Sequence, residues 1–173
     1  MLYYASMKKN AILIGMPGVG KSTAGVVLAK LAGYRFLDSD LLIQQEDGRL
    51  LREIIAQEGN AGFHRIEERI NAAIDVDRTV IATGGSVIYG PAAMAHFKEI
   101  GTVIYLRASY ETVASRVTNL VGRGVTMNRG QTLKDLYDER KGLYERYCDV
   151  AIDVDRQSIE ETALMMARII RGD

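Results

Sequence analysis

The chain has 173 residues, 47% apolar and 25% charged, which is enough for one domain with a sizeable core. Its 22 Lys and Arg residues balance 22 Asp and Glu residues, so it lacks the broad positive surface of a nucleic-acid binder or a polybasic membrane binder. A lone cysteine, Cys148, excludes an internal disulfide and favours a reducing compartment. We therefore expect a cytoplasmic monomer whose partner is a small molecule.

The N-terminal residues lack the pattern of a signal peptide, because the basic pair Lys8-Lys9 follows a short apolar piece and no long hydrophobic region is present. We interpret residues 1–6 as an extension before a start at Met7. No apolar run approaches the ~20 residues that a bilayer requires. We therefore expect no contact with a membrane.

Short apolar runs alternate with longer segments of helical character along the chain. None of these runs alternates strictly between apolar and polar residues, which is typical of strands covered on both faces in a parallel sheet. The pattern predicts an α/β domain over residues 1–173 with right-handed crossovers and a closing helix after the capping box Ser158–Glu161. The runs are 11–14, 35–37, 79–82, 102–106 and 150–152.

The first apolar run leads into Gly-Met-Pro-Gly-Val-Gly-Lys-Ser at 15–22, which has the form Gly, four residues, Gly-Lys-Ser/Thr. In this arrangement backbone N–H groups turn inward around phosphate oxygens at the start of a helix. Lys21 would reach the β- and γ-phosphates, and Ser22 would ligate Mg²⁺. The motif predicts a nucleoside triphosphate with Mg²⁺, bound by Gly15, Gly18, Val19, Gly20, Lys21, Ser22 and Thr23.

The second apolar run ends in Asp38-Ser39-Asp40. Two residues apart in extended chain, the aspartates point to the same side, toward the crevice at the carboxyl edge of a parallel sheet. One carboxylate could hold a metal-bound water while the other takes a proton from a substrate hydroxyl. Alternatively, one or both only cap the following helix, because Asp is a good N-cap residue.

Together with the phosphate-binding motif, further segments resemble the shikimate kinases in order and spacing from Lys8 to about Asp155. The resemblance implies a nucleoside-monophosphate-kinase-like fold: three α/β/α layers, a five-stranded parallel sheet, substrate-binding helices at about 40–75 and a lid at about 121–131. It also implies ATP-dependent phosphorylation of shikimate to shikimate 3-phosphate, in aromatic amino acid biosynthesis. The segments are Phe36-Leu-Asp-Ser-Asp40, Phe63-His-Arg-Ile-Glu67, Ala82-Thr-Gly-Gly85, Glu139-Arg140 and Leu143-Tyr144.

The resemblance also implies roles for individual residues. Asp38 would assist Mg²⁺, and Asp40 would bind the substrate hydroxyls and act as the base. Arg140 would bind the substrate carboxylate, Arg123 would approach the transferred phosphoryl group, and Arg116 would lie against the adenine ring. Without the resemblance, an exposed helical ion pair would explain Arg140 almost as well, and Arg116 could pair with Glu111 or lie in solvent.

Residues 121–131 contain three glycines and two arginines, and we expect them to form a loose, mobile lid. The segment looks too polar to pack. Arg123, flanked by glycines, therefore has little structural purpose, and we expect it to have a catalytic one. Lys21, Asp40 and Arg123 are thus the predicted catalytic residues.

The departures from the family pattern cluster in the predicted substrate site, which comprises Asp40, His64, Gly84, Gly85, Ser86 and Arg140. His64 stands where the family has a carboxylate-binding arginine, and Ser86 replaces the third of three glycines. The chain is then a divergent shikimate kinase with His64 as a weaker or protonated ligand, or a kinase for another hydroxy acid or polyol. His64 could also simply pair with Glu68 on the helix surface, and a non-catalytic ATP-binding module is a further alternative.

Overall fold

The structure is a computed structural model, and it describes residues 10–120 and 122–172. The interpreted extension at 1–6 and the first residue of the expected lid, at 121, lie outside the described residues. Within the described part of the chain, no helix is both long and apolar enough to cross a bilayer.

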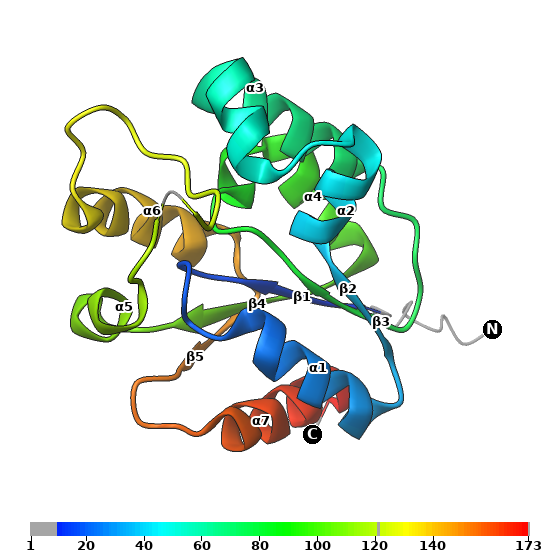
Figure 1. The fold of residues 1–173 in the computed structure, drawn as a ribbon. Helices are drawn as coiled ribbons and strands as arrows, with labels where there is room; N and C mark the ends of the chain where they lie inside the picture. Colours follow the sequence, from blue (N-terminus) through cyan, green and yellow to red (C-terminus); the bar gives the residue numbers. More distant parts are fainter. Residues whose placement is uncertain (1–9, 121, 173) are drawn as a thin grey trace.

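The fold is a three-layer α/β/α domain around a parallel sheet, as predicted (Figure 1). Its five strands have the order β2-β3-β1-β4-β5, and each coincides with a predicted run to within a residue at either end. The elements are β1 (Asn10–Ile14), α1 (Lys21–Ala32), β2 (Arg35–Asp38), α2 (Ser39–Asp47), α3 (Leu51–Ala72), β3 (Thr79–Ala82), the 3₁₀ turn η1 (Val87–Tyr89), α4 (Pro91–Ile100), β4 (Gly101–Arg107), α5 (Tyr110–Arg116), α6 (Leu133–Tyr147), β5 (Val150–Asp153) and α7 (Ile159–Arg171). The predicted capping box is present, with Ser158 and Glu161 each accepting a hydrogen bond from the other's backbone N–H.

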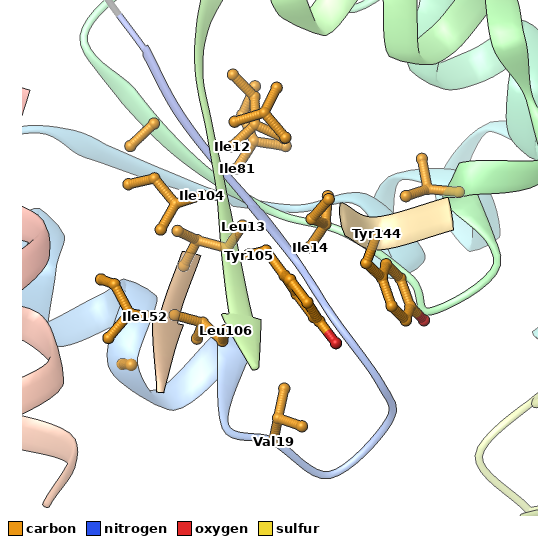
Figure 2. Packing of buried hydrophobic residues seen from close by; sticks show 14 of the residues in the cluster. Ile12, Leu13, Ile14, Val19, Ile81, Ile104, Tyr105, Leu106, Tyr144 and Ile152 are labelled. Atoms are coloured by element: carbon orange, nitrogen blue, oxygen red, sulfur yellow. The ribbon is translucent and has the colours of Figure 1, made fainter. Parts of the chain in front are cut away.

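Helices cover both faces of the sheet, which is why its strands are apolar throughout. Leu13 of β1 faces Gly25 of α1 so closely that a Cβ on the glycine would lie 3.2 Å from the leucine side chain. On the other face, Ile14 is in register with Tyr105 of β4, whose ring stacks on that of Tyr144 in α6 at 5.1 Å (Figure 2). Figure 1 shows α1 and α7 together on one side of the sheet.

The strand order determines where the site forms. Because β1 lies between β3 and β4 and all pairings are parallel, the carboxyl ends of β1, β2 and β3 meet at one edge. The phosphate-binding motif, Asp38 and the Gly84–Ser86 segment each follow one of these three strands. The fold therefore gathers at one edge three motifs that are far apart in the sequence, and next to two of them the Thr83 hydroxyl donates to the Leu13 carbonyl across 70 residues.

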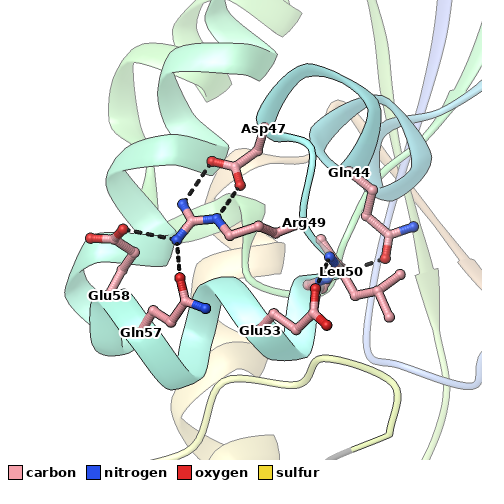
Figure 3. A network of polar contacts seen from close by, with 8 residues as sticks. Gln44, Asp47, Arg49, Leu50, Glu53, Gln57 and Glu58 are labelled. Carbon is pink, nitrogen blue, oxygen red and sulfur yellow. Dashed lines mark hydrogen bonds and ion pairs between the residues drawn. The ribbon is translucent and has the colours of Figure 1, made fainter.

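Helices α2 and α3 stand above this edge, and a polar network fixes the corner between them (Figure 3). The guanidinium of Arg49 makes two hydrogen bonds to Asp47, at 2.6 and 2.9 Å, and bonds Gln57 and Glu58 of α3 at 2.7 and 3.0 Å. At the start of α3, Glu53 accepts the backbone N–H of Leu50. The two helices occupy the range predicted for substrate binding, and their orientation is set by these contacts.

Residues 124–127 of the lid segment pack against α3 and α6, which corrects the expectation that the segment is too polar to pack. Thr126 is only 3% exposed, and the apolar side chains of Val125 and Met127 contact the main core. Gly124, at φ +67°, lies so near α3 that a Cβ there would come within 2.6 Å of the Leu51 Cβ. The segment packs because two apolar side chains flank Thr126, whose hydroxyl and carbonyl are hydrogen-bonded.

Candidate active site

A cavity of about 490 Å³ opens at the carboxyl edge of the sheet. Its walls come from the phosphate-binding loop, the start of α2, the segment after β3, the lid segment and α6, so elements from most of the chain contribute to it. Most of the predicted site residues line it. These are Gly18, Gly20, Lys21, Ser22, Thr23, Asp40, Gly84, Gly85, Ser86, Arg123 and Arg140.

The phosphate-binding loop turns sharply from β1 into α1. Gly20 is the N-cap of α1 at φ +96°, a left-handed conformation that side chains disfavour, so glycine is required here. Lys21 curls back over the loop, its Nζ donating to the carbonyls of Gly15 and Met16 at 2.7 and 2.9 Å. Burial lowers the pKa of Lys21 to about 8, and Asp40 counteracts part of this shift. A polyanion binding beside Lys21 would restore its full charge.

A second hollow of about 380 Å³ continues from the other side of the phosphate-binding loop. Arg116, at the end of α5, lines it together with Gly18, Val19 and Gly20. Gly18 lies close to Val117 and Arg116, which places Arg116 beside the phosphate-binding loop. The side chain of Arg116 is exposed, and among the described residues no ion pair joins it to Glu111.

Asp38 caps α2, one of the two roles that the sequence allowed, and it also contacts the phosphate-binding loop. One carboxylate oxygen, Oδ1, caps α2 by accepting the backbone N–H groups of Asp40 and Leu41. The other, Oδ2, accepts a hydrogen bond of 2.9 Å from the Ser22 hydroxyl. The helix cap therefore aims the second oxygen at the phosphate-binding loop.

The Ser22 and Asp38 pair fits Mg²⁺ in its donor chemistry. Both contribute oxygen atoms, and Mg²⁺ is commonly held by one or two protein oxygens together with water and substrate phosphates. Among the described residues there is no cluster of three or more His, Cys, Asp or Glu side chains that would make an all-protein metal site. The arrangement thus suits a metal that arrives with a nucleotide.

Asp40, in the first turn of α2, points into the cavity beside Lys21. Burial raises the pKa of its carboxyl to about 6; the charge of Asp38 adds to this rise and Lys21 opposes it. A carboxylate with a pKa near neutrality is a better proton acceptor than an ordinary aspartate, and it is still mostly ionised at pH 7. The position and basicity of Asp40 therefore suit a general base.

The Gly84–Ser86 segment is fixed by side chains from α3 and α6. Gly84 allows no side chain, because a Cβ there would lie 2.6 Å from Asp40 Oδ1 and 2.9 Å from Glu67 Oε1. The Ser86 hydroxyl donates to Glu67 Oε2 at 2.7 Å, and the Tyr144 hydroxyl donates to the Gly85 carbonyl at 2.6 Å. Ser86, the replacement for a family glycine, thus ties the segment to α3.

Glu67 is a site residue to which the sequence reasoning gave no role. It is 2% exposed, its Oε1 has no hydrogen-bond partner among the described residues, and burial raises its pKa to about 8. It is therefore mostly a neutral acid at pH 7. The available signal was helical spacing: Phe63, Glu67 and Ile70 recur on one buried face of α3, where a carboxyl is out of place.

Arg140 is buried in α6, at 1% exposure, so the alternative of an exposed helical ion pair is wrong. Its Nη2 donates to both the carbonyl and the hydroxyl of Thr126 at 3.0 Å, and its guanidinium lies 5.4 Å from the Tyr89 ring centre. Its Nε has no partner among the residues described. Because Arg140 lines the cavity, its guanidinium charge is suited to binding an anion there.

His64 lies behind the cavity wall and is not among the lining residues. Its ring stacks on Tyr89 at 4.8 Å, and its Nε2 lies 3.0 Å from the hydroxyl of Thr126, which does line the cavity. Glu68, the alternative partner, instead accepts the backbone N–H of Ala92. Burial and the nearby Arg140 lower the pKa of His64, which disfavours its protonated form.

Arg123 lines the cavity from the lid side, opposite the phosphate-binding loop. It is exposed, and it makes no hydrogen bond or ion pair with another residue of the described chain. Its charge therefore stays available to a ligand.

A phosphate-binding loop after the central strand of a parallel sheet, with a half-buried aspartate and two arginines around one cavity, defines a P-loop phosphotransferase of nucleoside-monophosphate-kinase-like fold. The shikimate kinase family model matches residues 17–171. The chain belongs to the shikimate kinase family.

Individual relatives agree with this assignment. The chain is 38% identical over 170 residues to a shikimate kinase from Thiobacillus denitrificans, covering 96% of this chain and 91% of that one. It is 30% identical to the solved shikimate kinase from Acinetobacter baumannii in complex with shikimate, with a TM-score of 0.84 over 95% and 93% of the two chains. A thymidylate kinase from Candida albicans, 10% identical with a TM-score of 0.62 over 96% and 92%, shares the fold alone.

Proposed function

We propose that this enzyme transfers the γ-phosphoryl group of ATP to a ring hydroxyl of shikimate, giving shikimate 3-phosphate for aromatic amino acid biosynthesis. The observation that carries the proposal is the convergence of Lys21, Asp40, Arg123 and Arg140 on one cavity, in a chain of the shikimate kinase family. Shikimate has the two features that these groups would recognise, hydroxyls for a base and a carboxylate for a buried arginine.

The phosphate-binding loop and Arg116 would hold the nucleotide. Backbone N–H groups of residues 15–23 would surround the phosphates, and Arg116 would cover the adenine in the second hollow. Ser22 and Asp38 would hold Mg²⁺, which when bound supplies positive charge to the phosphate oxygens. Lys21 would leave the carbonyls of Gly15 and Met16 and donate to the phosphates instead.

Asp40 would orient the acceptor hydroxyl and take its proton. As the hydroxyl oxygen bonds to the γ-phosphorus, the bond from that phosphorus to the oxygen bridging to the β-phosphate breaks, and ADP leaves. The free charge of Arg123 would stabilise the negative charge spread over the transferred phosphoryl oxygens. The position of Asp40 beside Lys21 in the cavity wall supports this assignment.

Arg140 would bind the acceptor carboxylate, with Gly84, Gly85 and Ser86 forming the adjoining wall. His64 is the predicted substrate ligand with the least geometric support, since its ring stacks on Tyr89 and its Nε2 is engaged with Thr126. This departure favours one second candidate, a kinase for another hydroxy acid or polyol. A non-catalytic ATP-binding module has less support, because binding ATP needs neither a base of raised pKa nor a free lid arginine.

The test is an assay of ADP release with shikimate, quinate and gluconate as acceptors, with the product identified by mass spectrometry. We expect release that depends on shikimate and yields a phosphate ester. In a parallel thermal-shift experiment with ADP and Mg²⁺, shikimate at a hundredfold excess over its dissociation constant should stabilise the protein by about 2.7 kcal/mol. Release with quinate or gluconate but not with shikimate would instead establish the second candidate.

We also infer that the enzyme acts as a monomer in the cytoplasm. Every group assigned to either substrate comes from a single chain, and one cysteine suits a reducing compartment. Size-exclusion chromatography with light scattering should give the mass of one chain, with and without the nucleotide.

A further inference from the structure

Thr126 is a polar lid residue in an unexpected position. It lines the cavity near Arg140, at what we call the acceptor end, although only 3% of the residue is exposed. Its hydroxyl lies 3.0 Å from Arg140 Nη2 of α6 and 3.0 Å from His64 Nε2 of α3. A single hydroxyl therefore joins the lid segment to both helices that border the acceptor end.

The hydrogen bonds around this hydroxyl leave one direction of donation open. A threonine hydroxyl has one proton and two lone pairs, whereas a guanidinium only donates, so Arg140 occupies one lone pair. When Nε2 of His64 carries a proton, it donates to the second lone pair, and the hydroxyl proton is then free to point into the cavity. We assign this tautomer to His64.

Helix α3 holds Thr126 in place through more than His64. Asn60, one helical turn before His64 and on the same face, donates from Nδ2 to the carbonyl of Met127 at 2.8 Å. The stack of His64 on Tyr89 fixes the orientation of the imidazole, with ring centres 4.8 Å apart and planes tilted by 23°. The threonine is thus presented to the cavity by a rigid frame.

We propose that Thr126 is an acceptor-binding residue whose hydroxyl donates to the acceptor carboxylate beside Arg140, and that His64 is a positioning residue that orients this hydroxyl. The inference rests on the proposed function, specifically on the assignment of Arg140 to the carboxylate. In this arrangement the Thr126 hydroxyl takes the place of the carboxylate-binding arginine that the family has at the position of His64. Binding of the acceptor is thereby coupled to the docking of the lid segment.

The first test compares Thr126→Val, which keeps the shape but removes the hydroxyl, with Thr126→Ser, which restores it. Because a hydrogen bond to a charged group is lost, Thr126→Val should raise the KM for shikimate about tenfold or more. The KM for ATP should stay within about twofold. Thr126→Ser should recover most of the loss, and Thr118→Val, at an exposed threonine shortly before the lid segment, serves as the matched control.

The second test examines how His64 acts. Glutamine can place an amide N–H near the position of Nε2, whereas asparagine is too short, so His64→Gln should retain acceptor affinity and His64→Asn should resemble Thr126→Val. Combining His64→Asn with Thr126→Val should add little to either single effect, because both remove the same donor. With the uncharged methyl ester of shikimate, all of these differences should shrink.

The outcomes separate the inference from the function on which it rests. Turnover of shikimate by the unaltered protein tests the proposed function, and its absence overturns both. Given turnover, equal KM values for shikimate in Thr126→Val and the unaltered protein overturn the inference alone. So does an equal loss with shikimate and its methyl ester, because a purely structural role of Thr126 would affect both acceptors alike.

Discussion

The nucleotide half and the acceptor half of the cavity are built in different ways. One continuous segment, residues 15–23, supplies most of the nucleotide half through its backbone and the start of α1. The acceptor half instead takes individual side chains from α2, α3, α6 and the lid segment, such as Asp40, Glu67, Thr126 and Arg140. The first half depends on local conformation, and the second depends on how distant elements pack.

If this division is correct, substitutions of acceptor-half side chains should impair the chemistry or acceptor binding and leave the affinity for the nucleotide unchanged. The largest effect is expected for Asp40→Asn, which keeps the shape but removes the proton acceptor. We expect kcat to fall by about 10²–10⁴-fold. Calorimetric titration should give an ADP affinity close to that of the unaltered protein. Normal turnover by this variant would exclude Asp40 as the base.

A smaller effect is expected for Arg140→Lys. Lysine keeps the charge but cannot hold both oxygen atoms of Thr126 and present a planar donor edge to a carboxylate. The KM for the acceptor should rise by about 10- to 100-fold, while the KM for ATP changes little. The exposed Arg146→Lys, on the same helix, is the matched control. An equal rise in both KM values would mean that Arg140 of α6 contributes to nucleotide binding as much as to acceptor binding.

The same division explains what could be predicted from the sequence. The strands follow from short apolar runs, and the phosphate-binding loop follows from a contiguous motif, because each is set by residues adjacent in the chain. The position of Asp38 could also be predicted from the sequence, because a carboxylate at the end of a strand can cap the next helix and face the crevice. The double role of Asp38 needed the structure, because it depends on the distance to Ser22.

The acceptor half was harder to predict, because its contacts span long separations in the sequence. The His64 side chain meets Thr126, 62 residues away, and Ser86 meets Glu67, 19 residues away. The sequence indicated that His64 and Ser86 depart from the family pattern, but not that both side chains make new hydrogen bonds. The composition of the lid segment also could not indicate that it packs. Its packing depends on Asn60 of α3 and Arg140 of α6, which donate hydrogen bonds to its backbone carbonyls.

Glu67 provides a pH-dependent test of the acceptor half. Its folded-state pKa is raised from 4.5 to about 8, so between these values the folded protein holds a proton that the unfolded chain has released. Stability should therefore fall as pH rises through this window, by up to about 1.4 kcal/mol per pH unit for one proton. Glu67→Gln removes the titration while keeping an oxygen for Ser86.

Between about pH 5 and pH 8 the free energy of unfolding of the unaltered protein, measured in urea, should fall, whereas that of Glu67→Gln should not show this fall. The difference between the two proteins should therefore change in favour of Glu67→Gln as pH rises. The exposed Glu145→Gln should follow the unaltered protein throughout. Parallel pH curves for Glu67→Gln and the unaltered protein would mean that Glu67 is ionised in the folded state.

The smallest effect is expected in the nucleotide half, from Arg116→Ala. The side chain is exposed and borders the second hollow, so its stacking on a base would take place partly in water, where it contributes little. The KM for ATP should rise about two- to fivefold, with the KM for shikimate and kcat nearly unchanged. The exposed Lys30→Ala, at the far end of α1, should leave all three constants alone. A rise in the KM for shikimate instead would place Arg116 with the acceptor and break the division between the two halves, because its side chain would then act across the phosphate-binding loop.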